Sequence, residues 1–244
     1  MIFYSDRNGS LDIFKQDIDQ SSAEPLVTGP EDEVALGLSP DGAWLHYVSS
    51  PRGGDLSAPK RLMRVPVSGG PAQLMFITTD VNWNLWCARA PSNFCAYADN
   101  SKKPMVFYAF DPVAGKKGRE IFRVENGNNF DVFPDGRVAV LLDDPRQGRV
   151  RIIRPTGETE REFTVEGWSA INHIWCSADN KGLYLTSSPF LAATLLYVDL
   201  HGKASVLWQP KGADDTWGVP SPDGRYLAIM SPTLTTGAWL IENF

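Results

Sequence analysis

The stretch Ser221-Pro222-Asp223-Gly224-Arg225-Tyr226-Leu227-Ala228-Ile229 is a short polar turn that leads directly into a run of mainly apolar residues. Pro fixes the first corner of such a turn, Asp bonds back to the local backbone, and Gly takes the position that needs a positive φ. Related turns begin at residues 39, 90, 133 and 177, so successive starts are 51, 43, 44 and 44 residues apart. The chain therefore contains an internal repeat of somewhat more than forty residues.

Each repeat combines this turn with several short strands. Apolar residues alternate with polar ones in runs rich in β-branched and aromatic side chains, which is the pattern of half-buried strands. The first complete unit is expected to use residues 34–38, 44–48, 61–67 and 73–77. A period near forty with four strands per unit is typical of an all-β propeller, in which sheets are arranged radially around a channel. Residues 1–244 are expected to form one such domain.

The number of strands predicts six blades, mainly of four antiparallel strands. Four complete units lie between a leading group of three strands, which begins at Ile2, and a trailing group of three, which ends with Ala238–Glu242. The first and last blades are thus expected to be incomplete. An upstream segment of roughly 20 to 30 residues would supply both missing strands, so we expect this chain to be the C-terminal part of a longer protein. A ring closed with two three-stranded blades is the alternative.

Composition and charge exclude several classes of partner. The net charge is -6, and no run of Lys and Arg is longer than two residues. We therefore expect no nucleic-acid partner and no attraction to an anionic membrane surface. No stretch approaches 18 consecutive apolar residues, so no membrane insertion is expected. No signal segment is recognised in this chain, which leaves a bacterial extracytoplasmic (periplasmic) location and a cytoplasmic one both open.

Cysteine and histidine patterns give no sign of a cofactor or a metal. Cys87, Cys95 and Cys176 lack metal-ligand spacing and are interpreted as small buried strand residues, although a bridge from Cys87 to Cys95 is possible if the two lie on adjacent strands. The three histidines are assigned to different blades, which makes a poor metal cluster. Nucleophile-elbow, zinc-protease and phosphate-loop motifs are absent from the sequence. We expect no cofactor, no metal and no catalytic residue.

The repeat resembles a known family. Ile2-Phe3-Tyr4-Ser5-Asp6-Arg7-Asn8-Gly9-Ser10-Leu11-Asp12-Ile13-Phe14 is similar to the strand-turn-strand signature of TolB-type, WD-like propeller repeats, and Leu38-Ser39-Pro40-Asp41-Gly42 resembles their defining turn. The ending, Gly237 to Phe244, looks like the C-terminus of propellers attached to bacterial serine/threonine kinases and winged-helix regulators. The resemblance implies a sensing or interaction module that is linked to an N-terminal effector domain.

The predicted blade topology places the repeated turns on one face and the variable connections on the other, which we call the mouth face. Asn, Trp and acidic residues gather in the connections of the mouth face. Amides and carboxylates supply directional hydrogen bonds there, and Trp supplies a stacking surface. The alternative is structural, since Asn and Asp tolerate loop geometry and Trp can fill the gap between blades. The candidate ligand-binding residues at the channel mouth are Glu33, Asn82, Asn84, Asn129, Asn172, His173, Asp215 and Trp217.

Two acidic residues allow a more specific hypothesis. Glu33 and Asp215 occupy equivalent positions on two inner strands, so they could face each other across the channel mouth. Such a pair could act in glycoside hydrolysis, which uses two carboxyl groups across a substrate. It could instead bind Ca²⁺, which prefers oxygen ligands.

The sequence therefore predicts a non-catalytic propeller that binds a protein, a peptide or a small polar or sugar ligand at its mouth face. A carbohydrate-active lyase or hydrolase is one alternative. The substrate-gating propeller of a serine peptidase is another. The ligand itself is not indicated by any motif.

Overall fold

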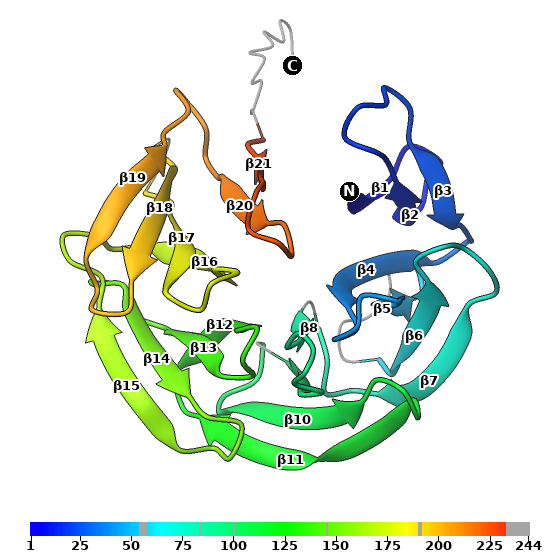
Figure 1. Ribbon diagram of the computed structural model, residues 1–244, viewed down its shortest axis with the longest axis horizontal. Helices are drawn as coiled ribbons and strands as arrows, with labels where there is room; N and C mark the ends of the chain where they lie inside the picture. The colour runs from blue at the N-terminus through cyan, green and yellow to red at the C-terminus, as the bar shows by residue number, and fades with distance from the viewer. Residues whose placement is uncertain (54–57, 83, 100, 145, 190–191, 233–244) are drawn as a thin grey trace, which may run out of the picture.

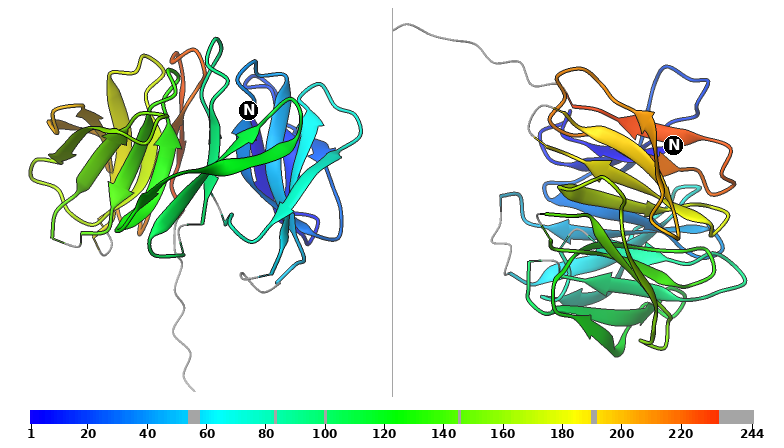
Figure 2. Two further views of the ribbon diagram at one scale, coloured as in Figure 1. Left: turned by 90° about the horizontal axis from the view of Figure 1, so that it is seen from below. Right: turned by 90° about the vertical axis from the view of Figure 1, so that its left-hand side faces the viewer.

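A computed structural model of the protein describes residues 1–53, 58–82, 84–99, 101–144, 146–189 and 192–232. Within these residues the regular secondary structure consists of 21 β-strands in six antiparallel sheets. The sheets are arranged around a common centre, and the first strand of each four-stranded sheet lies innermost (Figure 1). Figure 2 shows the same ring from two sides, with the sheets standing next to one another. The all-β propeller is thus confirmed.

The sheets follow the chain in order, and we call the first five blades one to five. Blade one contains β1 (Ile2–Ser5), β2 (Asp12–Lys15) and β3 (Glu24–Val27). Blade two contains β4 (Asp32–Leu38), β5 (Trp44–Ser50), β6 (Lys60–Pro66) and β7 (Gln73–Thr78). Blade three contains β8 (Asn84–Cys87), β9 (Cys95–Ala98), β10 (Met105–Asp111) and β11 (Lys116–Val124).

The second half of the described chain continues this order. Blade four contains β12 (Gly127–Val132), β13 (Val138–Leu142), β14 (Arg149–Ile153) and β15 (Thr159–Thr164). Blade five contains β16 (Ile171–Cys176), β17 (Gly182–Ser187), β18 (Thr194–Asp199) and β19 (Ala204–Trp208). The last sheet, which we call the terminal ribbon, has only β20 (Trp217–Pro220) and β21 (Leu227–Met230).

The expectation of six blades is wrong. Five sheets of three or four strands form blades, and the sixth is the two-stranded terminal ribbon. The repeated turn joins only the first two strands of a unit. Its fifth copy therefore indicated an inner hairpin, but not the outer strands that a sixth blade would need. Ile229 and Met230 of the ribbon are 43% and 51% exposed, unlike the buried inner strands of blades two to five. The further strand predicted at residues 238–242 lies outside the described residues.

Apolar side chains are buried between successive blades. Blades three and four share a cluster that includes Phe107 and Phe130, whose ring centroids are 4.8 Å apart. Blades four and five share another, which includes Phe133 and Leu185. Each blade is therefore stabilised by its neighbours, since a small sheet with one uncovered face buries too little apolar surface to be stable alone.

The repeated turn has the predicted hydrogen bonds. The Ser39 hydroxyl donates to Asp41 Oδ1 at 2.5 Å, and the Trp44 amide donates to Ser39 Oγ at 2.9 Å. Equivalent contacts recur around Asp179 and Asp223. The positive φ falls at Gly42, Gly136, Asn180 and Gly224, with values of 71°, 96°, 62° and 69°. These residues maintain the turn, as expected.

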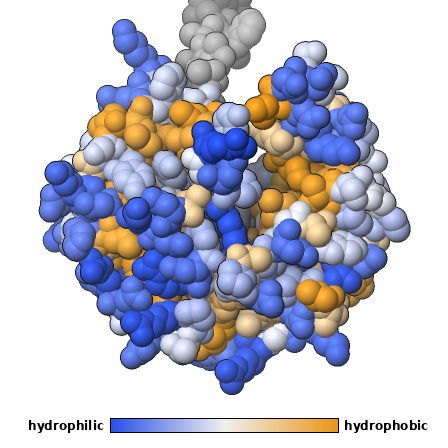
Figure 3. Space-filling view, viewed as in Figure 1, coloured by the Kyte–Doolittle hydropathy of each residue, from blue (hydrophilic) through white to orange (hydrophobic). Residues whose placement is uncertain are grey.

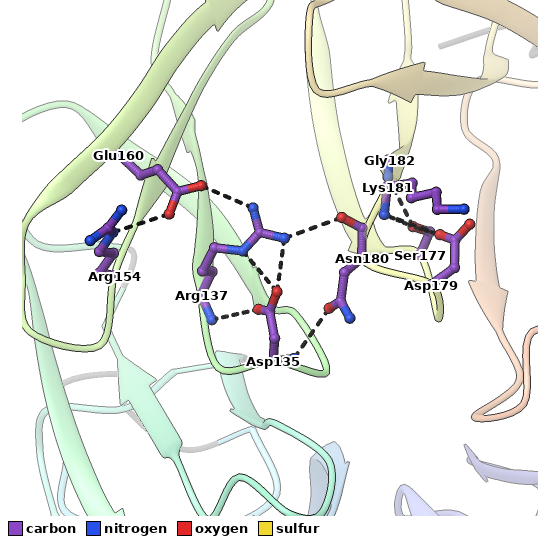
Figure 4. A network of polar contacts seen from close by, with 9 residues as sticks. All are labelled: Asp135, Arg137, Arg154, Glu160, Ser177, Asp179, Asn180, Lys181 and Gly182. Carbon is purple, nitrogen blue, oxygen red and sulfur yellow. Dashed lines mark hydrogen bonds and ion pairs between the residues drawn. The ribbon is translucent and has the colours of Figure 1, made fainter.

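Turns of neighbouring blades are also bonded to each other. Arg137 of blade four donates to the Asn180 carbonyl oxygen of blade five at 3.2 Å, and Asn180 Oδ1 accepts from the Asp135 amide at 3.1 Å (Figure 4). Arg137 also pairs with Asp135 and, at 3.1 Å, with Glu160. These polar turn residues thus hold blades four and five together.

Two cysteines form a disulfide between inner strands of blade three. Cys87 on β8 and Cys95 on β9 are directly opposite each other in the sheet register and are bonded. Cys176 is a free, buried thiol. The Cys87–Cys95 bridge, which the sequence left open, is therefore present.

Replacing Gly224 by Val should lower the free energy of unfolding by about 1 kcal/mol or more. Its φ is +69°, and an added Cβ would lie 3.0 Å from the Ala178 Cβ. Urea unfolding gives the measurement. Gly42→Val isolates the backbone contribution, because Gly42 has a φ of +71° but no atom within 4 Å of an added Cβ, so this variant should be destabilised less than Gly224→Val. An unchanged midpoint for Gly224→Val would contradict the role assigned to this turn.

Reduction of the disulfide should also destabilise the protein. The two cysteines are 8 residues apart. Closing a loop of this size lowers the conformational entropy of the unfolded chain, which stabilises the folded state by about 2.5 kcal/mol. Urea unfolding with and without a reductant checks this. A Cys87→Ser, Cys95→Ser double variant should match the reduced protein and be insensitive to reductant. Equal midpoints for the oxidised and reduced wild type would show that the bridge contributes nothing.

Candidate functional site

Asp215, just before the terminal ribbon, is the centre of a polar network at the mouth face. Its Oδ2 lies 2.8 Å from His173 Nε2. Its Oδ1 accepts hydrogen bonds from the Ser188 hydroxyl at 3.1 Å, the Asn172 amide group at 3.4 Å and the Thr216 backbone at 2.9 Å. This carboxylate therefore holds three side chains of blade five in fixed positions.

Blade four reaches the same network through Asn129. Its side-chain amide donates to the Asn172 carbonyl oxygen at 3.1 Å, and its Oδ1 accepts from the Phe130 amide at 2.8 Å. The network thus contains residues from blade four, blade five and the segment that leads into the terminal ribbon. We call Asn129, Asn172, His173, Ser188, Asp215 and Trp217 the mouth cluster.

Aromatic rings lie beside His173 in the mouth cluster. The Trp217 ring centroid is 5.1 Å from that of the imidazole, and the Trp175 centroid is 5.6 Å away in a stacked arrangement. Side chains of His173 and Asp215 are 26% and 30% exposed. The imidazole is therefore held by a carboxylate and by two indoles while remaining partly accessible to solvent.

Irregularities in the inner strands bring these side chains together. The register of β12 with β13 shifts between Gly127 and Asn129, and that of β16 with β17 shifts between Ile171 and His173. Ala170, directly before β16, has a φ of 52°. Such bulges redirect side chains and break strict alternation. They explain why neighbours in sequence, Asn172 and His173, both contact Asp215.

Two neighbouring cavities, each with a volume of about 250 Å³, lie near the mouth cluster, and one of them is lined in part by the cluster residues Asn172 and Ser188. The inner cavity is lined by Asn128, Asp143, Asp144, Asn172 and Ser188, with Leu142, Ala170 and Ile171 as its apolar part. The outer cavity is lined by Leu142, Asp143, Glu125, Asn126, Arg149 and Arg151. They share Leu142 and Asp143 in their linings, so they lie side by side over blade four and the start of blade five, and we call the two together the cleft. Figure 3 shows the opposite face, on which the repeated turns lie, with hydrophilic residues at its centre.

The structure divides the eight predicted site residues into two groups. Five of them, Asn129, Asn172, His173, Asp215 and Trp217, belong to the mouth cluster. Glu33, Asn82 and Asn84 lie instead on blade two or at the start of blade three, where all three are buried. Sequence reasoning missed Trp175 and gave Ser188 no individual role. Trp175 lies two residues after His173 in the regular part of β16, so strand alternation, which can be read from the sequence, places it on the same side. Ser188 reaches the site through the loop after β17, which has no clear sequence signal.

Glu33 has an unusual environment on β4. It is 5% exposed, and its Oε2 has no hydrogen-bond partner among the described residues. Burial raises the pKa of this carboxyl to about 7, and the nearby charges of Asp12 and Asp32 act in the same direction. No ion pair or hydrogen bond between Glu33 and Asp215 is present in the described structure, so the two do not form a bonded pair.

Metal ligation finds no geometric support in the residues that the structure describes. Within them, no three His, Cys, Asp or Glu side chains are arranged to hold a metal ion. The assignment of the histidines to three different blades was wrong, since His173 on β16 and His201 after β18 both belong to blade five. His46 is fully buried on β5, and burial lowers its pKa to about 4. No helix in the described chain is long and apolar enough to cross a bilayer.

Known proteins resemble this chain in structure. No protein-family model matches the sequence, and no curated protein matches it. TolB from Acinetobacter baumannii superposes with a TM-score of 0.67 at 14% identity, over 95% of this chain and 62% of that one. The candidate TolB of Agrobacterium tumefaciens gives 0.65 at 18% identity, over 96% and 90%. An oligogalacturonate lyase in complex with manganese gives 0.58 at 15% identity, over 92% and 65%.

The fold of this chain is therefore that of a β-propeller similar in structure to TolB. The chain spans less than two thirds of the length of the Acinetobacter TolB and of the lyase. Propellers host many unrelated functions, so structural neighbours at this level of sequence identity indicate the fold of this chain but not its activity.

Replacing Glu33 by Gln should stabilise the protein at pH 8 more than at pH 5. A folded-state pKa near 7, above the usual 4.5, means that the folded state binds more protons between these values, so stability falls as the pH rises through this window. Glutamine removes the titration, and the gain at pH 8 should be roughly 1 to 3 kcal/mol. Urea unfolding at the two pH values gives the measurement.

The control for this experiment is Glu24→Gln, because the Glu24 side chain is 74% exposed and should give the same small change at both pH values. If Glu33→Gln also behaved identically at pH 5 and pH 8, the raised pKa would be contradicted.

Proposed function

We propose that this propeller is a non-catalytic recognition module that binds a protein, a peptide or a small polar or sugar ligand at its mouth face. The observation that supports this is the mouth cluster, in which Asp215 fixes His173, Ser188 and Asn172 next to Trp217 and beside a cavity. Ligand sites typically combine a few oriented polar groups with aromatic and apolar surface. No metal or cofactor is needed for such binding.

The proposal extends to how the module is used. We propose a sensor role in which ligand binding is passed to an effector domain on the N-terminal side; this part of the proposal rests on the resemblance of residues 237–244 to propellers of bacterial kinases and winged-helix regulators that was drawn from the sequence alone. The net charge of -6 argues against a nucleic-acid partner for the propeller itself.

A carbohydrate-active lyase or hydrolase is the second candidate, and one contact favours it. His173 and Asp215 are 2.8 Å apart, which is the arrangement in which a carboxylate orients an imidazole for general acid–base work. We rank binding first because the Ser188 hydroxyl donates to Asp215 and not to His173, so the cluster lacks the nucleophile–base contact of a serine hydrolase.

Trp217→Ala should weaken ligand binding about tenfold or more, because it removes the aromatic surface beside His173. Asp215→Asn should weaken it as well, because the amide cannot hold His173, Ser188 and Asn172 in the same way. The measurement is ligand-observed NMR and calorimetry with a panel of neutral mono- and disaccharides and capped di- and tripeptides. Product analysis of the same mixtures detects turnover.

Trp208→Ala is the matched control. Trp208 lies on the outer strand β19 and is 47% exposed, so its removal should leave binding unchanged. Binding that survives both Trp217→Ala and Asp215→Asn would reject the mouth cluster as the ligand site. Glycan turnover that Asp215→Asn abolishes would replace the binding proposal with the enzymatic one.

A further inference from the structure

The mouth cluster adjoins the inner cavity of the cleft, and the outer cavity lies beside the inner one. Asn172 and Ser188 line the inner cavity, and both also donate to Asp215 Oδ1. Any ligand in the inner cavity that contacts these residues therefore lies next to the mouth cluster. Leu142 and Asp143 line both cavities.

The size of the cleft favours an extended ligand. Each cavity alone, at about 250 Å³, is smaller than most small-molecule sites, which measure roughly 300 to 1,000 Å³. The two together fall within that range. A ligand that fills them would be a short chain of linked units and not a single small ring.

The charges around the cleft disfavour an anionic ligand. Among the described residues lining the inner cavity none is Lys, Arg or His, whereas Asp143 and Asp144 both line it. In the outer cavity, Arg149 and Arg151 are already ion-paired with Glu162, the latter at 2.8 Å. The basic groups of the outer cavity are thus engaged by Glu162. Asp144 lies 4.0 Å from Arg149 and Asp143 lies 3.7 Å from Lys103, both at the long end of ion pairing, so an added carboxylate in the inner cavity would still meet two acidic groups.

The remaining chemistry matches a hydroxyl-rich molecule. Carboxylates and amide oxygens accept hydrogen bonds from hydroxyl groups, the amide of Asn128 can also donate, and Leu142 and Ile171 offer apolar surface to the C–H face of a sugar ring. The Asp143 side chain is 60% exposed, and its ion-pair contact with Lys103 is long, at 3.7 Å. Its oxygens therefore retain capacity for further hydrogen bonds.

We propose that the cleft binds a neutral oligosaccharide of at least two sugar units, with one end at the mouth cluster and the chain extending over blade four, and that Asp143 and Asp144 exclude uronate-containing glycans. This inference rests on the proposed function, since it names the ligand class of the same site. It selects among the ligands left open above and adds Asn128, Asp143 and Asp144 as residues that determine specificity.

The test is calorimetry on the full chain with cellotriose, maltotriose, mannotriose and triacetylchitotriose, each compared with its monosaccharide, and with trigalacturonate. At least one neutral trisaccharide should bind tenfold or more tighter than its monosaccharide, and trigalacturonate should not bind. Asn128→Ala should weaken the trisaccharide about five- to tenfold. The Asp143→Asn, Asp144→Asn double variant should admit trigalacturonate.

Asn93→Ala is the matched control, because Asn93 is exposed in a turn on the opposite face and should have no effect. The inference is overturned if no neutral trisaccharide binds more tightly than its monosaccharide, if trigalacturonate is preferred, or if Asn128→Ala leaves binding unchanged. Capped peptides that bind in a Trp217-dependent way, with no glycan bound, would overturn this inference and leave the proposed function standing. If no glycan and no peptide binds, both fail.

Discussion

Phe107 of blade three packs against Phe130 of blade four at 4.8 Å, and apolar clusters of this kind fill the spaces between successive blades from blade one to blade five. None of these sheets has a core of its own, so each depends on the adjacent sheet for burial. Because the sheets pack against each other, the ends of their strands are held in fixed positions relative to one another. The inner strands are held side by side, and the residues at their ends are brought to a common face.

Packing between blades leaves the strand ends free to be polar. At the mouth face, Asp215 draws together groups from blade five and the start of the terminal ribbon, and Asn129 of blade four bonds to Asn172. The site is built where three sheets meet, on the buried inner strands of blades four and five and at the start of the more exposed terminal ribbon. A cluster supported in this way is fixed before a ligand arrives, which reduces the ordering cost of binding.

The sequence was informative where local chemistry determines structure. Ser39, Asp41 and Gly42 predict their turn because each has a specific bond or φ to satisfy, and the phase of the inner hairpins followed from them. The number of blades did not follow, since outer strands depend on packing that the turn does not encode. Likewise His173 and Asp215 were recognised as candidates. Trp175, two residues after His173 on the same strand, follows from alternation and could have been recognised, whereas Ser188 joins them only through the loop after β17.

The acidic residues show why residue type alone does not reveal the site. Asp41 accepts hydrogen bonds from a hydroxyl group and a backbone amide within its own turn. Asp131 is buried and accepts from the Cys176 amide at 2.6 Å, which ties blade four to blade five, and burial raises its pKa to about 6. Asp215 orients polar side chains at a partly open surface. Asp41 lies in the turn after an inner strand, Asp131 lies within one, and Asp215 precedes one. Position within the repeat, and not composition, therefore separates a turn-forming or blade-joining carboxylate from one available to a ligand.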